Sequence, residues 1–163
     1  MRVLTLTQPW ATLVAIGAKR IETRSWATKY RGPLLIHAAA GLGPVGGIRG
    51  FTELLGQTAF TRALEPHYGY DYTLGAFGLI DCLPFGAIVA TCKLVDCVRT
   101  DLWSSVEHGS EIWQVPPGNI SREYAFGDYT PGRWAHLYAD ARPLATPIPA
   151  RGQLGLWNWE GSL

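Results

Sequence analysis

The spacing of apolar residues along the chain predicts several short strands and one early helix. Residues 2–7 alternate leucine with β-branched residues, as a strand does. Apolar residues between 10 and 17 recur at helical spacing, with Pro9 at the opening turn and Gly17 as the stop. Further strands are predicted over 19–26 and 34–40. The strand predicted over 86–98 exceeds the usual length, which predicts a bend or a bulge.

The remaining segments predict helices, loops and two final strands. Residues 48–64 have helical spacing and predict one or two helices within an insertion at about 41–75. We expect loops at 67–72 and at 101–132, the second with a short helix. Strands at 134–144 and 154–159 would then be joined by an extended, proline-stiffened connector at 144–152. The pattern predicts the α+β class: one domain over 1–163, a small barrel of five to six strands with helices at its mouth.

Composition narrows the class of function. Of the 163 residues, 47% are hydrophobic and 17% charged, which argues against a disordered chain. The net charge is only +1, so affinity for nucleic acid would need a local basic patch, whereas a mixed, solvated surface is the alternative. Cys82, Cys92 and Cys97 suit neither a disulfide framework nor a zinc site. With no signal-like segment and no apolar run of ~20 residues, we expect a cytoplasmic protein without a membrane partner.

Three segments resemble the ASCH domain family. Residues 4–39 contain QPWA, then G-x-K-x-x-E-x-R-x-W and RG-x-L-x-I-x-A in the family's order, and residues 86–97 and 123–159 are similar to its later strands. The resemblance implies a PUA-like, mixed or antiparallel β-barrel with a cleft beside the first helix, edged by Lys19, Glu22 and Arg24. Family members are linked to RNA or DNA binding, to ribonuclease activity and to removal of an acyl group from N4-acetylcytidine.

One departure from the family pattern weighs against the amidohydrolase. That branch has a K-x-x-T arrangement, whereas here Glu22 stands where the threonine belongs and Thr23 should face the other side of the strand. A glutamate from a later loop assists the catalytic pair in that branch, and Glu123 is its candidate counterpart. If the protein is an enzyme, the resemblance implies a hydrolase, either a ribonuclease or an N4-acetylcytidine amidohydrolase. Its catalytic residues would be Lys19, Glu22 and Glu123. No metal or other cofactor is expected, because no histidine or carboxylate near His37 has metal-ligand spacing.

The leading hypothesis is a module that binds RNA or single-stranded nucleic acid in a basic cleft; a modified nucleoside is the alternative guest. Cations would contact phosphate and tryptophans would stack on bases. The candidate binding residues are Lys19, Arg24, Trp10, Trp26, Lys29 and Arg31. Each has a structural alternative. Lys19 could complement the end of a helix, and Arg24 could form a surface ion pair with Glu22. The tryptophans could belong to the core, and Lys29 and Arg31 to an ordinary charged turn.

Two further interpretations stay open. Asp128 and Arg133 are predicted to fix a turn, since Asp, Pro and Gly dominate turns. A third hypothesis, an interaction module without nucleic-acid function, would require an exposed apolar patch near Trp157 and Trp159. The sequence makes no prediction of oligomeric state.

Overall fold

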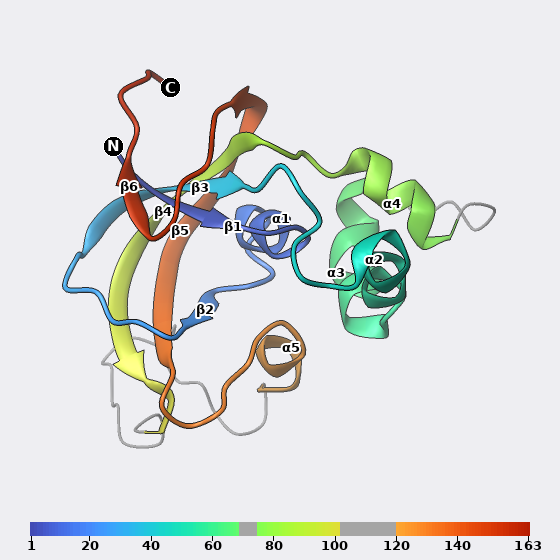
Figure 1. Ribbon diagram of the computed structural model, residues 1–163, viewed down its shortest axis with the longest axis horizontal. Helices are drawn as coiled ribbons and strands as arrows, with labels where there is room; N and C mark the ends of the chain where they lie inside the picture. Colours follow the sequence, from blue (N-terminus) through green and yellow to red (C-terminus); the bar gives the residue numbers. More distant parts are fainter. Residues whose placement is uncertain (69–74, 102–119) are drawn as a thin grey trace.

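The protein consists of a curled sheet with one helix against its concave side and a group of helices beyond it (Figure 1). The computed structural model describes residues 1–68, 75–101 and 120–163. The elements in chain order are β1 (Arg2–Leu6), α1 (Trp10–Ala15), β2 (Ile21–Arg24), β3 (Gly32–Ala38), α2 (Gly47–Leu55), α3 (Thr58–Tyr68), α4 (Ala76–Cys82), β4 (Ala87–Arg99), α5 (Ile120–Ala125), β5 (Trp134–Pro149) and β6 (Leu156–Asn158).

The six strands form one sheet in the order β2-β5-β4-β3-β1-β6, in which β1 and β3 are parallel and the other pairs antiparallel. β4 and β5 are the longest strands, and their register shifts three times along the ladder. Such irregularities increase strand bending, so the sheet curls into a half-barrel whose edges are β2 and β6. The predicted α+β class with five to six strands is confirmed, as is the bulged strand near 86–98.

Helix α1 lies between two hydrophobic cores. Ala11, Val14 and Ala15 pack into the core of the half-barrel, while Leu13 belongs to a second core formed with α2, α3 and α4. The sequence predicted one apolar face on this helix, but all of Ala11–Ala15 is buried because helices cover its other side.

Other differences from the predicted elements have local causes. The loop predicted at 67–72 is wrong for residues 67 and 68, which belong to α3, and its other residues lie outside the described ones. Helix α4 was not predicted. The connector predicted after residue 144 is instead the second half of β5, paired with the start of β4. Its prolines are tolerated because β2 pairs only with Trp134–Leu137, so beyond that stretch β5 has a free edge. Most of the loop predicted at 101–132 lies outside the described residues. Among the described helices, none has the length and apolar character of a membrane-crossing segment.

The loop between β5 and β6 is tied closely to the sheet. The Ala150 amide donates to the Gly86 carbonyl at 3.0 Å, and the Ala150 carbonyl lies 3.0 Å from His37 Nε2. Gly152 lies two residues further on, and a Cβ added there would lie 2.6 Å from His37 Cε1 and 3.1 Å from Thr5 Oγ1. The loop backbone therefore rests directly on the His37 ring, and only glycine leaves room for this contact.

We predict that Gly152→Ala destabilises the protein by about 1–3 kcal/mol, because the added methyl group must displace a buried ring or the loop. Gly41→Ala is the matched control, since a Cβ at Gly41 meets nothing within 4 Å and its φ is ordinary; that change should be neutral or slightly stabilising. Urea unfolding of both variants measures the difference in their stability. Equal unfolding midpoints for Gly152→Ala and Gly41→Ala would contradict the close contact at Gly152.

Candidate cleft between the sheet edge and the helices

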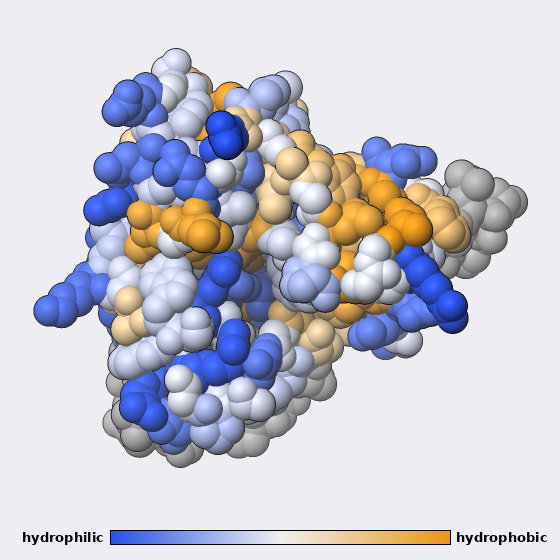
Figure 2. All heavy atoms as spheres, in the orientation of Figure 1, coloured by the Kyte–Doolittle hydropathy of each residue, from blue (hydrophilic) through white to orange (hydrophobic). Residues whose placement is uncertain are grey.

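A cleft of about 770 Å³ opens where edge strand β2 faces β1 across the mouth of the half-barrel, with the helices opposite. Figure 2 shows it as a hollow between the strand and helix parts of the surface. Its lining comes from β1, α1 and the residues between them, from β2, from the β3–α2 connection with α2 and α3, from the end of α5 and the α5–β5 connection, and from the β5–β6 loop. The lining residues are Thr5, Thr7, Trp10, Glu22, Thr23, Arg24, Ala39, Pro44, Val45, Leu54, Phe60, Ala125, Phe126, Gly127, Asp128, Arg133, Gln153, Leu154 and Gly155.

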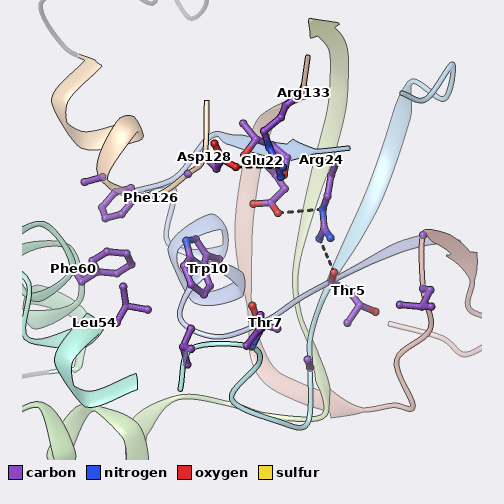
Figure 3. Close-up of a pocket in the computed structure, with 18 of the residues that line it drawn as sticks. Thr5, Thr7, Trp10, Glu22, Arg24, Leu54, Phe60, Phe126, Asp128 and Arg133 are labelled. Carbon is purple, nitrogen blue, oxygen red and sulfur yellow. Dashed lines mark hydrogen bonds and ion pairs between the residues drawn. The ribbon is translucent and has the colours of Figure 1, made fainter. Parts of the chain in front are cut away.

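One wall of the cleft is apolar and is supported by the helical core. Trp10, at the start of α1, is half-buried and packs edge-on against Phe60, whose ring is in turn 5.0 Å from that of Phe126. Phe60 and Phe126 are almost fully buried, so Trp10 is the aromatic ring accessible from the cleft. Figure 3 shows these residues, with Leu54, on the side opposite the polar ones. This wall can offer an aromatic surface to a flat guest.

The opposite wall is polar and is built by β2. Alternation along this strand buries Ile21 and Thr23 and turns Glu22 and Arg24 toward the cleft side, as predicted. Glu22 Oε1 lies 3.1 Å from Arg24 Nε, and Arg24 Nη2 donates to the Thr5 carbonyl at 2.9 Å (Figure 3). β2 and β1 do not pair through backbone hydrogen bonds, and the Arg24 side chain bridges the gap between them.

The charges that line the cleft balance. Besides Glu22 and Arg24, it contains Asp128 and Arg133, paired at 3.3 Å. Asp128 also accepts from the Thr130 amide at 3.1 Å, which is the turn predicted for this segment, and that hydrogen bond lowers the pKa of Asp128. Two carboxylates and two guanidinium groups give no net charge, so the cleft differs from the basic one that the sequence predicted.

Lys19 is fully buried behind the polar wall. Its Nζ donates to the carbonyls of Ile21 at 2.5 Å and Phe126 at 3.0 Å and lies 3.6 Å from Glu22 Oε2. Lys19 is not among the residues that line the cleft, and the turn after α5 lies close to its nitrogen, since a Cβ on Gly127 would be 3.5 Å from Nζ. This geometry does not suit the phosphate contact predicted for Lys19; the ammonium instead joins three segments of the fold.

Glu123, the third predicted catalytic residue, is near enough to Lys19 to feel its charge, and its carboxylate is held by hydrogen bonds within the fold. Its carboxylate accepts from the Arg20 amide at 2.6 Å, and the Tyr129 hydroxyl is 3.4 Å from its other oxygen. Burial raises the pKa of Glu123 above its usual value, while Lys19, the Arg20 amide and Tyr129 oppose the rise. Glu123 is not among the residues that line the cleft.

Three predicted binding residues lie away from the cleft lining. Trp26 packs edge-on against His136, whose Nε2 is 3.1 Å from the Trp26 carbonyl. Lys29 is exposed on the connection to β3, and Arg31 pairs with Asp96 at 2.6 Å. Of the residues predicted to bind nucleic acid, the structure therefore brings Trp10 and Arg24 together in the cleft.

Much of the lining was not predicted. The β3–α2 connection supplies Pro44 and Val45, helices α2 and α3 supply Leu54 and Phe60, and the β5–β6 loop supplies Leu154. Their apolar character is ordinary for a core or a surface, so the sequence offered no signal for them. In the described ranges, His, Cys, Asp and Glu side chains do not gather in groups of three that could hold a metal ion.

Comparisons with known proteins agree with the motif resemblance. The family model of the ASCH domain matches residues 4–143. An 84-residue stretch is 40% identical to Activating signal cointegrator 1 of Mus musculus and 38% identical to that of Homo sapiens. This match covers 49% of the chain but only 14% of each cointegrator. Crystal structures of two single-residue variants of ZmASCH from Zymomonas mobilis are 16% identical, with a TM-score of 0.43, and cover 91% of this chain and 74% and 72% of theirs.

We predict that Lys19→Met destabilises the protein by about 3 kcal/mol, because methionine fills the space but leaves two carbonyls without their donor and Glu22 with Arg24 as its remaining partner. Lys29→Met, on the exposed connection, is the control and should change stability by no more than about 0.5 kcal/mol. Urea unfolding distinguishes the two; a Lys19→Met variant as stable as the control would contradict the structural role.

The raised pKa of Glu123 gives a stability difference with a definite sign. The unfolded chain loses this proton before the native protein does, so the stabilisation is complete below the ordinary pKa near 4.5 and is lost as pH rises through the native pKa. Glu123→Gln should therefore gain stability relative to wild type as pH rises from about 4 to 7. Urea denaturation at several pH values measures this difference. Glu53→Gln, at an exposed position on α2, is the control for losing a charge. If the stability difference between Glu123→Gln and wild type did not change with pH, the raised pKa of Glu123 would be contradicted.

Proposed function

The chain belongs to the ASCH domain family, and on this premise we propose that its cleft binds RNA or single-stranded nucleic acid by accepting one unpaired base. The observation that carries the proposal is the pairing of an accessible tryptophan wall with a hydrogen-bonding wall across one cleft. Unpaired bases are recognised in this way, by stacking on aromatic rings and by hydrogen bonds along their edges.

The polar wall offers groups of the kind that read a base edge. Glu22 is a carboxylate acceptor for an amino group, and it lies next to the Arg24 guanidinium, which is 28% exposed. Trp10 supplies a stacking surface on the other side, worth about 1–3 kcal/mol per base in proteins of this kind. A volume of about 770 Å³ falls within the range of small-molecule sites, which is ample for a single nucleotide.

The balanced charge limits the part that phosphates can play. Each phosphate neutralised by a cation contributes to the salt dependence of binding. Because the lining carries no net charge, we expect affinity to depend weakly on salt, in contrast to binding along a basic groove.

Hydrolysis of a modified nucleoside or of RNA is the second candidate, and the position of Glu22 in the cleft favours it. A carboxylate there is placed as a general base would be. Lys19 argues against the lysine-dependent version of this chemistry, since its ammonium is buried and engaged with two carbonyls behind the wall.

Fluorescence anisotropy with a labelled eight-nucleotide RNA, and with DNA of the same sequence, tests the binding proposal. We predict that Trp10→Leu weakens binding by about tenfold through loss of stacking. Trp26→Leu, a half-buried tryptophan outside the lining, should leave affinity unchanged. Absence of wild-type binding at low salt, or equal losses in both variants, would count against the proposal.

The hydrolase candidate needs a separate experiment. Wild type and Glu22→Gln are incubated with N4-acetylcytidine and with RNA, and the products are read by mass spectrometry. Turnover by the wild type that is absent from the variant would favour catalysis over simple binding, whereas no turnover by either would remove this candidate.

A further inference from the structure

Leu154 is exposed to an extent that folding does not explain. Its side chain is 99% exposed, whereas the other large apolar residues that are exposed in the described part of the chain range from 49% to 61%. A leucine this exposed buries almost no surface in the folded protein, so it contributes almost nothing to the hydrophobic stabilisation of the fold. Single exposed leucines occur on ordinary surfaces, but this one also lines the cleft.

The loop that presents Leu154 is fixed at both ends. On one side, Ala150 is bound to Gly86 and to His37, and Gly152 rests against the His37 ring. On the other side, Leu156 begins β6, and the indole of Trp157 donates to Thr5 Oγ1 at 3.1 Å. A short loop held this closely keeps its tip beside the cleft even though all of residues 151–155 are exposed.

The position of the tip suits contact with a base rather than with phosphate. Leu154 and Gly155 line the same cleft as Thr5, whose carbonyl receives Arg24, and they directly precede β6, which pairs with β1; the leucine therefore lies on the strand side of the cleft. An apolar patch lies over the β5–β6 loop in Figure 2, bordering the hollow. Phosphates are hydrated anions and gain nothing from an aliphatic neighbour, whereas the face of an unpaired base is an apolar surface.

We propose that Leu154 is an apolar contact for an unpaired nucleobase at the mouth of the cleft. This inference rests on the proposed function, because it specifies how the strand side of the same cleft holds its guest. Proteins that hold bases out of a stack often place aliphatic side chains against them. Removal of Leu154 should then weaken binding without affecting the fold.

The test compares Leu154→Ala with wild type on a single-stranded RNA octamer and on an abasic octamer with the same number of phosphates. Fluorescence anisotropy should show about fivefold weaker binding of the normal octamer by the variant, as expected for losing part of a leucine's burial. The abasic octamer offers only phosphate contacts, so wild type should bind it far more weakly than the normal octamer, and Leu154→Ala should bind it no more weakly than wild type does. Leu154→Met should restore most of the affinity, and the melting temperature should stay at the wild-type value.

Leu163→Ala is the matched control, since this leucine is 61% exposed and does not line the cleft; it should bind as wild type does. An equal loss on both octamers would overturn the base contact, because the leucine would then act without a base. Wild-type affinity of Leu154→Ala for the normal octamer would overturn it too, while leaving the proposed function standing. If wild type itself binds neither octamer, the proposed function fails and this inference fails with it.

Discussion

The buried ammonium of Lys19 is the interaction on which the geometry of the cleft depends. A cation without solvent must have an opposite charge and acceptors for its protons, or its burial costs several kcal/mol. Here the acceptors are backbone carbonyls of β2 and of the turn after α5, with Glu22 as the counter-charge. Because one nitrogen needs all three, the polar wall and the turn carrying Phe126 stay in register with the end of α1. Lys19 thus acts on the site by positioning others.

The second constraint is that the sheet does not close. β2 and β6 are its edges, so β2 faces β1 with no ladder between them, and Arg24 reaches across to the Thr5 carbonyl instead. Unpaired strand edges need protection from other chains; a guanidinium bridge protects this one while keeping the strands further apart than a ladder would. The cleft is the space between these two strands, bordered on its other side by the helices. Its location therefore follows from incomplete barrel closure.

The part of this arrangement that the sequence predicted is the part encoded by local periodicity. Alternation in β2 placed Glu22 and Arg24 on one face, and the apolar spacing of α1 placed Trp10 at the start of the helix. The burial of Lys19 could not be predicted, because lysines are almost always exposed and one of its acceptors is a backbone carbonyl 107 residues away, which no side-chain pattern reveals. The position of Leu154 could not be predicted for a related reason, because its loop is placed by the contact of the Gly152 backbone with the His37 ring.

Balanced charge in the cleft has consequences for how a guest would be chosen. A basic groove attracts any polyanion from a distance and binds it with little regard to sequence. Glu22 and Asp128 cancel the two guanidinium groups that face the cleft, and the whole chain carries a charge of only +1. Long-range steering is then weak, and the free energy of binding must come from short-range contacts with the shape and edges of one base. Such a site would discriminate between bases more than between strands, because stacking and edge hydrogen bonds change with the base whereas phosphate contacts do not.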